Sequence, residues 1–421
     1  MPGRAALEIP IRAIVVGAAL LLLPSVVRAD EVVRWNRVAT DASVAAALDP
    51  LTESRIFAIA HLAMHDAANA VDPRYASYRP HEVQATGAAV EAAVAQAAHD
   101  VLAALLPAGA DAYASALRES LAGVSDADAR DRGAAVGRAV ARDLLADRQE
   151  DGASRKVDYR PGTEDGVYRP TPPDLTPALL AQWGGVRPFA LQSAAQFRPA
   201  PPPAPGSPEA LAECEEVKAF GGEKSAARTA EQSEIARFWY ESSPQGWNRI
   251  ARTLAAARQL DPLASARFFA LVNVAMADGF IAGFEAKYHY RYWRPVTALH
   301  AMGEAAWMPH LPTPPVPDHP STHTVVGAAA ATAMARLLGT DYVPFEMTSG
   351  PPYAGITRRF WSLSQAAREN GASRVFAGIH FTTAVRSGYR QGEEVAEYAY
   401  ANLLRPLAET AAPGTRLAGG N

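Results

Sequence analysis

The chain contains a single cysteine, Cys214, among its 421 residues. One thiol cannot close an internal disulfide, and it cannot build a cysteine-rich metal site. Positive charge is not in excess either, because the net charge is -4 at pH 7, and nothing global points to a nucleic-acid partner. Any attraction for an anion must therefore come from a local group of cations.

Apolar runs long enough to cross a membrane are also lacking. The clearest run, residues 13–23, is shorter than the roughly 20 residues that a helical span needs. Arg4 and Arg12 precede it and a small-residue cleavage site follows at residues 27–29, which is typical of an export signal. We therefore expect residues 1–29 to be removed and the mature chain to be exported to the periplasm or the cell exterior, without a membrane span.

Alternation of apolar and polar residues, the pattern of a half-buried strand, is scarce. Alanine and leucine at helical spacing dominate, so we expect an all-α protein built as a helical bundle, with long apolar faces that favour a homo-oligomer. Helices are expected over residues 51–71, 82–106, 111–122, 126–149 after a Ser125 cap, from 207, from a capping box at 229–232, over 261–293, 321–338, 359–380 with breaks at Gly371 and Gly378, and 388–404.

Proline interrupts this pattern between residues 156 and 208. Proline cannot continue a helix, yet Trp183, Phe189 and Leu191 give the segment large apolar anchors, so we predict a loop draped over the helices. The expected division is a signal peptide at 1–29, an N-terminal helical region at 30–155, the draped segment at 156–208, a catalytic helical domain at 209–407 and a disordered tail at 408–421.

Three short segments in the second half carry residues suited to a tetrahedral oxyanion. In the first, Lys287 and Arg294 are seven residues apart, which on a helix places both cations on nearly the same face. In the second, Ser321 and Thr322 precede His323 where a helix begins, and free backbone N–H groups favour an anion there. Taken singly, the first segment also fits a pair of solvated surface cations, and the second also fits an N-cap serine beside an ordinary histidine.

The third segment contains Arg374 and His380. Arginine is the natural bidentate partner of a tetrahedral oxyanion. His380 follows apolar residues, and a buried imidazole can serve as a nucleophile or as a ligand, although a histidine satisfied within the core would give the same pattern.

The order and spacing of these segments resemble the three-part signature of the superfamily of type 2 phosphatidic acid phosphatases and vanadium-dependent haloperoxidases. That signature reads Lys-x6-Arg-Pro, then Pro-Ser-Gly-His, then Ser-Arg-x5-His-x3-Asp. The matching residues are Lys287, Arg294 and Pro295, then Pro320, Ser321 and His323, then Ser373, Arg374 and His380. His61-x3-His65-Asp66 and Asp278 are similar to the exported bacterial haloperoxidase-like branch, which implies its helical-bundle fold.

Two positions depart from the signature, since Thr322 stands where the family has glycine and Ala384 where it has aspartate. Threonine keeps the backbone N–H that the glycine offers, but it adds bulk and does not favour positive φ. The resemblance implies that the aspartate orients a site histidine, so that task would pass to another acid or to water. The candidate acids are Asp66, Asp278, Asp318 and Glu285.

If the protein is a haloperoxidase, the resemblance implies that vanadate is the cofactor and is bonded to His380. Hydrogen peroxide and a halide would then be the small-molecule partners. His323 would move protons, and Lys287 would polarise the peroxide for attack by the halide. The residues expected to hold the oxygens are Lys287, Arg294, Ser321, Thr322 and Arg374.

Three alternatives stay open. An acid phosphatase without a cofactor would use His380 to attack the phosphorus of a phosphomonoester and His323 to protonate the leaving alcohol. A degenerate, non-catalytic oxyanion-binding protein would explain Thr322 and Ala384. A zinc hydrolase is suggested by the spacing of His61 and its partner four residues on, but the glutamate of the familiar protease motif is missing.

Overall fold

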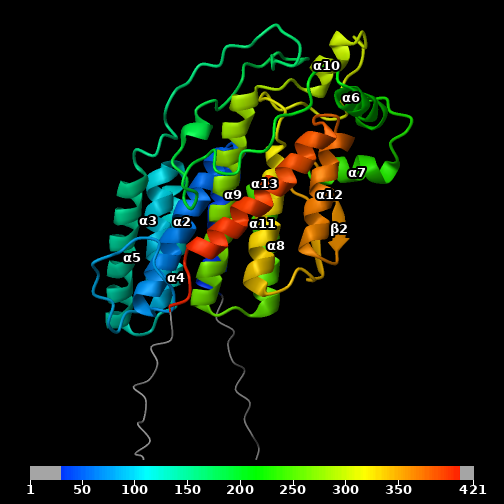
Figure 1. Cartoon of the computed structure of the whole chain (residues 1–421). Helices are drawn as coiled ribbons and strands as arrows, with labels where there is room; N and C mark the ends of the chain where they lie inside the picture. Colours follow the sequence, from blue (N-terminus) through cyan, green and yellow to red (C-terminus); the bar gives the residue numbers. More distant parts are fainter. Residues whose placement is uncertain (1–29, 408–421) are drawn as a thin grey trace, which may run out of the picture.

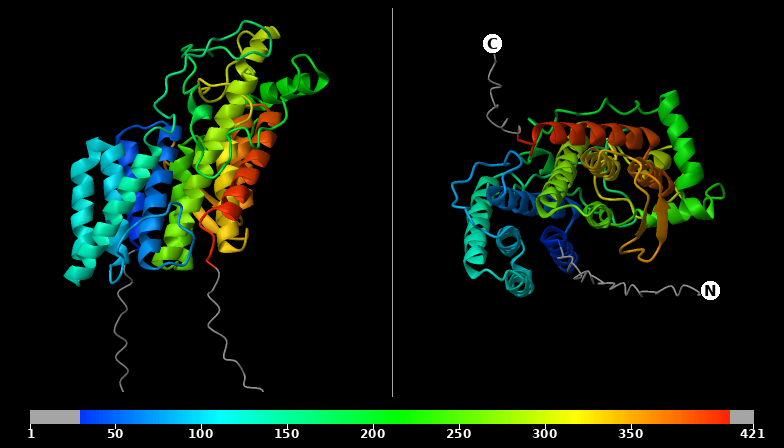
Figure 2. Two further views of the ribbon diagram at one scale, coloured as in Figure 1. Left: turned by 60° about the vertical axis from the view of Figure 1, so that its left-hand side comes forward. Right: turned by 90° about the horizontal axis from the view of Figure 1, so that it is seen from below.

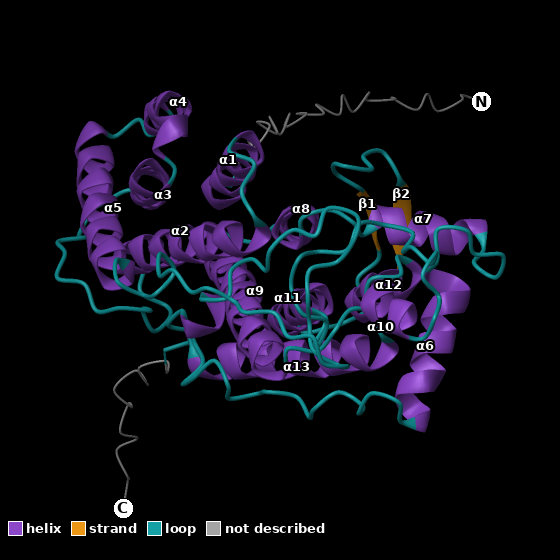
Figure 3. Ribbon diagram, turned by 90° about the horizontal axis from the view of Figure 1, so that it is seen from above, coloured by secondary structure: helices purple, strands orange, loops and turns teal. Residues whose placement is uncertain are grey.

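The structure is a computed structural model that describes residues 30–407. Within these residues the chain forms thirteen α-helices, two short 3-10 helices and one two-stranded antiparallel hairpin (Figures 1 and 3), which confirms the all-α expectation. The elements are α1 (Glu31–Ala45), α2 (Pro50–Val71), α3 (Val90–Leu105), η1 (Pro107–Gly109), α4 (Ala110–Ala122), α5 (Ala127–Arg148), η2 (Trp183–Gly185), α6 (Pro208–Gly221), α7 (Ala230–Phe238), α8 (Ser243–Arg258), α9 (Pro262–Tyr290), α10 (Pro295–Ala301), α11 (Thr322–Leu338), β1 (Phe345–Thr348), β2 (Thr357–Phe360), α12 (Leu363–Phe376) and α13 (Thr382–Asn402).

The helices form two packed groups that share one seam (Figure 2). In the first group α3 packs against both α2 and α5, and in the second α11 packs against α9, α12 and α13. The seam is the contact between α2 and α9, both of which are buried over most of their length. Alanine at the contact positions lets these helices approach closely, so one continuous apolar core runs through both groups.

Helix α9 occupies the centre of the molecule. Among the described helices it alone is long and apolar enough to cross a membrane by length and composition, contrary to our expectation that no such stretch exists. Helices α1, α2, α8, α11 and α13 pack against it, and 94% of its most apolar window is buried inside the structure. Burial of this kind is typical of a core helix.

The capping signals place most helix starts correctly. Asp261 caps α9 by accepting from the N–H groups of Leu263 and Ala264, and Thr229 forms the expected capping box with Gln232. The cap assigned to Ser125 was wrong by one residue, because the side chain of Asp126 accepts from the Ala129 N–H and caps α5. Either residue type is a good N-cap, so composition alone does not distinguish them.

The segment expected to be helical over residues 359–380 was partly wrong. Its beginning forms β2, which pairs with β1, and the helix α12 starts only at Leu363 and runs through Gly371. The break at Gly378 is correct, since that residue has φ +77°. The strand β1 does alternate, with Phe345 and Met347 buried, but β2 does not, and four residues are too few to distinguish a strand from the helical pattern around it. Two other starts were also displaced, since α3 begins at 90 and α13 at 382. The helices α1, α8 and α10 were not anticipated.

Residues 149–207 cross one end of the bundle, the upper end in Figure 1, as a loop that contains only η2. Trp183, Phe189 and Leu191 are buried against the helices. The buried carboxylate of Asp278 accepts the backbone N–H groups of Phe189, Ala190 and Leu191 at 2.7–3.0 Å. Three such bonds satisfy the buried carboxylate and hold the loop across the bundle.

Candidate active site

The three segments singled out in the sequence meet at one end of the bundle. Helices α9 and α12 end there, carrying Lys287 and Arg374, and α11 and α13 begin there, next to His323 and His380. The spacing of Lys287 and Arg294 predicted that they share a helix face, and this was wrong. Instead α9 ends at Tyr290, the chain turns, and Arg294 becomes the N-cap of α10.

The three cations are buried side chains, with relative exposures of 0% for Lys287, 1% for Arg294 and 4% for Arg374. Burial, together with the charge of Arg294, lowers the pKa of Lys287 well below its usual value, and burial lowers the pKa of Arg374 to about 10. Buried cations of this kind are costly unless an anion accompanies them. An anion bound among them would oppose both causes of the shift at Lys287.

Backbone carbonyls hold two of these cations in place. The Lys287 ammonium donates to the carbonyl of Pro317 at 2.6 Å and to that of Asp318 at 2.9 Å. Arg294 donates to the carbonyls of Val316 at 2.7 Å and Ile379 at 2.6 Å. A neutral carbonyl orients a cation without cancelling its charge, so the positive charge remains available to an anion.

Arg374 is held from the other side of the site. Its guanidinium donates to the Ser373 hydroxyl at 3.0 Å and to the Trp239 carbonyl at 3.1 Å, and it lies 5.6 Å from the ring centroid of Tyr240. Trp239 and Tyr240 follow α7, which no motif in the sequence linked to the site. Their contribution depends on tertiary packing and is visible only in the structure.

His380 lies at the centre of the cluster. Burial and the charges of Arg294, Lys287 and Arg374 lower its pKa well below the usual value, so the imidazole is neutral. Its Nδ1 lies 2.8 Å from Oδ1 of Asp318, and its Nε2 lies 3.0 Å from a guanidinium nitrogen of Arg294. A neutral imidazole with one nitrogen available can bond an electrophilic centre or attack it.

Asp318 is the acid that faces this histidine among the four candidates. Asp278 is engaged by the loop described above, and Asp66 accepts from two backbone N–H groups and from His65 and His81. Glu285 pairs with an arginine of the draped loop. Burial raises the pKa of Asp318 to about 7, with the nearby cations opposing the rise.

His323 is anchored at one nitrogen and available at the other. The Ser243 hydroxyl lies 2.7 Å from Nδ1, whereas the buried Nε2 has no hydrogen-bond partner among the described residues. Burial, with Arg374, lowers the pKa of this imidazole well below its usual value. A neutral ring with a free Nε2 can exchange a proton with a bound group. Ser243, at the start of α8, was another contributor that the sequence did not reveal.

The start of α11 supplies hydroxyl and backbone donors. The Ser321 hydroxyl accepts a hydrogen bond from Thr324 at 2.9 Å and so keeps its own hydrogen free to donate, while its backbone N–H is used by the Ala384 carbonyl at 2.9 Å. The backbone of Thr322 is the first helical residue and has no positive φ, so threonine is not strained there. The helix N-terminus favours negative charge at this position.

The bulk of Thr322 is accommodated by a glycine on α9. A Cβ at Gly283 would lie 2.5 Å from Cγ2 of Thr322, closer than two carbon atoms can approach. The methyl group therefore fills the space beside Gly283, and the exchange of glycine for threonine in the second segment leaves the other parts of the site in place.

Comparisons with known proteins agree with this geometry. Residues 267–409 match the family model of the VCPO second helical-bundle domain. The solved structure of a bacterial vanadium-dependent iodoperoxidase is similar over 90% of this chain and 97% of that protein, with a TM-score of 0.79 and 28% identity. The chain has the helical-bundle fold of the vanadium haloperoxidases and is similar to them in sequence. A bacterial vanadium-dependent chloroperoxidase shares the fold, with a TM-score of 0.68 at 18% identity over 84% of this chain and 92% of that one.

Among curated members of the superfamily, the vanadium chloroperoxidase of Curvularia inaequalis is 25% identical to this chain over 197 residues. The matched region is 33% of this chain and 32% of that protein, so it spans about a third of the curated relative. The region that matches the family model contains every one of the seven site residues expected from the sequence.

The residues of the site fit a vanadate ion. Three buried cations face one carboxylate in contact with them, and a neutral histidine, a free hydroxyl hydrogen and a helix N-terminus complete the donor set. This arrangement is short of negative charge and rich in donors, which suits a tetrahedral oxyanion. Among residues 30–407 no group of three His, Cys, Asp or Glu side chains is placed to hold a metal ion, which leaves the zinc alternative without a ligand set.

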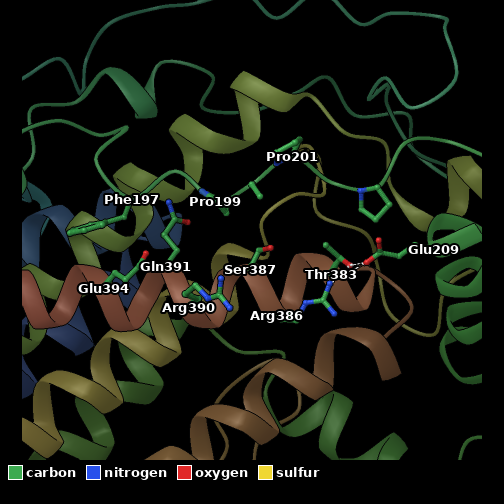
Figure 4. Close-up of a pocket in the computed structure, with 12 residues that line it drawn as sticks. Phe197, Pro199, Pro201, Glu209, Thr383, Arg386, Ser387, Arg390, Gln391 and Glu394 are labelled. Carbon is green, nitrogen blue, oxygen red and sulfur yellow. Dashed lines mark hydrogen bonds and ion pairs between the residues drawn. The ribbon is translucent and has the colours of Figure 1, made fainter. Parts of the chain in front are cut away.

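An open cavity of about 330 Å³ runs along α13 and is separate from this site (Figure 4). Residues 197–203 of the draped loop and Glu209 of α6 line its other wall. Each cation that lines the cavity has an acid nearby. Arg386 lies 3.2 Å from Glu209, and Arg390 is one helical turn from Glu394. This near balance of charge gives no reason for strong anion binding there.

Proposed function

We propose that this protein is a vanadate-dependent haloperoxidase that uses hydrogen peroxide to oxidise a halide. The observation that carries the proposal is the buried excess of positive charge around a neutral His380. A fold that buries Lys287, Arg294 and Arg374 together gains stability from an anion that offsets their charge. The similarity to a bacterial vanadium-dependent iodoperoxidase makes vanadate the anion that fits best.

Each residue has a distinct part in holding the cofactor. Nε2 of His380 is the ligand atom, and the remaining residues neutralise the oxygens and donate hydrogen bonds to them. Bound vanadate supplies a Lewis acid that activates hydrogen peroxide toward the halide. The residues around the oxygens are Lys287, Arg294, Arg374, Ser321 and the backbone N–H of Thr322.

The protein itself moves the protons. Nε2 of His323 is unpartnered and uncharged, so it can take the first proton of hydrogen peroxide while Ser243 keeps the ring in place. Lys287 has two of its three ammonium hydrogens on backbone carbonyls, which leaves the third to donate toward the bound group. Burial of Lys287 and Ser243 keeps bulk water away from these groups and strengthens their interactions.

The competing function is an acid phosphatase built from the same residues. The contact between Asp318 and His380 favours this reading as well, because it would support His380 as a nucleophile toward phosphorus. His323 would then protonate the leaving alcohol through its free Nε2. Phosphate and vanadate are both tetrahedral oxyanions, so the choice between the reactions needs an assay.

A paired assay on one preparation tests the proposal. The purified chain is dialysed free of phosphate, loaded with orthovanadate and given hydrogen peroxide with iodide, bromide or chloride, and separately p-nitrophenyl phosphate. We expect halide oxidation that requires both vanadate and peroxide, with iodide tested first because the similar bacterial structure is an iodoperoxidase. Arg374→Ala should abolish it, whereas Arg386→Ala, an exposed cation of α13, should not.

Phosphate-ester hydrolysis that vanadate inhibits, without oxidation of any halide, would establish the phosphatase instead. Vanadate binding without either activity would establish a degenerate oxyanion-binding protein. We further propose, from the N-terminal signal, that the mature protein acts outside the cytoplasm.

A further inference from the structure

We propose that Asp318 is the positioning residue of His380, replacing from the loop before α11 the aspartate that the family signature has at position 384. The inference rests on the proposed role of His380 as the atom that bonds the oxyanion. It assigns to Asp318 a specific task, which is to fix one tautomer of His380 and the direction of its lone pair.

The backbone of Asp318 is held rigidly on both sides. Its N–H donates to the Tyr292 carbonyl at 2.9 Å, and its own carbonyl accepts from the Lys287 ammonium at 2.9 Å. Its carboxylate is fully buried, and Oδ1 lies 2.8 Å from Nδ1 of His380. Neither oxygen has a hydrogen-bond partner among the described residues, so the ring nitrogen beside Oδ1 is the donor within reach of this acid.

Two neighbours of the ring favour the same tautomer. The carboxylate of Asp318 favours a hydrogen on Nδ1 of His380, because an ionised carboxylate is only an acceptor. Arg294 is only a donor, and its nitrogen lies 3.0 Å from Nε2 and 3.4 Å from Nδ1, so the nearer contact favours the lone pair on Nε2. A hydrogen on Nδ1 toward the acid and a lone pair on Nε2 toward Arg294 suit both neighbours.

Position 384 contributes its backbone to the site and offers no acid. The Ala384 carbonyl accepts the Ser321 N–H at 2.9 Å and ties the start of α13 to the start of α11. The side chain is buried, with 1% exposure. A carboxylate there would bring a second buried negative charge to the same end of the bundle, beside an acid that already contacts His380.

The sign of a binding change separates positioning from simple electrostatics. Asp318 carries negative charge close to an anion site, so its removal should strengthen the binding of any anion if charge is all that matters. If the carboxylate instead orients His380, its removal should weaken the binding of an anion that bonds Nε2. Orthovanadate can form that bond, whereas inorganic phosphate in a binding experiment reports on the cations.

The experiment measures dissociation constants of orthovanadate and of inorganic phosphate for the wild-type chain, Asp318→Ala and Asp318→Asn. We expect Asp318→Ala to bind vanadate about 10- to 100-fold more weakly, as is usual when a group that orients a ligand histidine is lost, and to bind phosphate unchanged or more tightly. Asp318→Asn keeps an acceptor oxygen and should retain vanadate affinity to within about threefold. Glu285→Gln, which removes a charge that pairs with Arg198 instead, is the matched control.

Tighter vanadate binding by Asp318→Ala, or equal changes for the two anions, would overturn the proposal. Nitrogen-15 NMR of labelled histidines, with His380→Gln to identify the signal, provides a test that needs no ligand. The wild-type spectrum should show the Nδ1–H tautomer at His380, and Asp318→Ala should lose that single tautomer while Asp318→Asn keeps it. An unchanged tautomer in Asp318→Ala would contradict the assignment even if the protein proves to be a phosphatase.

Discussion

At the scale of single residues, the site depends on the partners that hold one nitrogen of each catalytic histidine. Ser243 lies against Nδ1 of His323 and leaves Nε2 without a partner among the described residues. Asp318 faces Nδ1 of His380, and Arg294 lies nearest to Nε2. The sequence signature specifies which histidines are present, but it does not specify these anchors, because they come from α8 and from the loop before α11.

Ser243→Ala tests the anchor of His323. We expect halide oxidation at saturating vanadate to fall at least tenfold, a part of the 10²- to 10⁴-fold that a positioned acid or base contributes, while vanadate affinity stays near that of the wild type. Turnover number and dissociation constant, measured on the same preparation, check this. The neighbouring Ser242 donates to Glu53 instead, so Ser242→Ala is the control and should keep its activity. Equal losses in both variants would point to a general disturbance of α8.

At the scale of elements, some features are set by local sequence signals and others by tertiary contacts. Caps such as Asp261 and Thr229 act within one turn of a helix, so they could be found in the sequence. The β1–β2 hairpin and the turn that separates Lys287 from Arg294 depend on what the chain packs against, and they could not. The seven site residues were found because a signature links them, whereas the choice of Asp318 among four acids required their positions.

The contact between α9 and α11 gives a stability prediction. Gly283→Ala should lower the free energy of unfolding by about 1–3 kcal/mol, because the added methyl group meets Cγ2 of Thr322. Thr322→Ser removes that methyl group, so the double variant should regain most of the loss. Urea denaturation of the two single variants and the double variant measures the coupling. Additive losses would show that the two side chains do not compete for the same space.

At the scale of the whole molecule, buried neutral histidines make the fold sensitive to acid. Burial lowers the pKa of His61 to about 4, with the Phe57 carbonyl opposing the shift and Arg252 adding to it. Nε2 of His61 lies 2.9 Å from the side-chain amide nitrogen of Asn36, which makes the ring part of a buried polar network. Because its folded pKa lies below the unfolded value near 6.5, the unfolded chain binds the proton first.

The contribution of His61 is therefore complete above about pH 6.5 and is lost as the pH falls toward about 4. The shift corresponds to about 3 kcal/mol at most. His61→Gln should consequently show a shallower fall in stability than the wild type between pH 7.5 and pH 4.5, measured as the urea midpoint. His99→Gln, on the partly exposed surface of α3, should follow the wild type. Parallel curves for all three proteins would mean that His61 does not titrate on unfolding.

The N-terminal signal gives a prediction for the whole chain. Residues 1–29 lie outside the described residues, and the tail at 408–421 does too. We expect the mature protein recovered from the periplasm or the medium to begin at Asp30, which N-terminal sequencing would check. Asp30 is also the N-cap of α1, so cleavage there would leave the first helix with its cap. An intact Met1 on the active protein would contradict export by this signal.

The carbonyl groups that hold Lys287 and Arg294 have a practical consequence. These carbonyl groups stay in place when an anion arrives, so the cations attract any tetrahedral oxyanion, and vanadate gains the bond to His380 in addition. Phosphate that is far more abundant than vanadate in the medium will compete for the site. Protein grown or purified in phosphate will therefore carry phosphate, and its peroxidase activity will reflect the history of the sample until exhaustive exchange into a phosphate-free buffer with vanadate restores it.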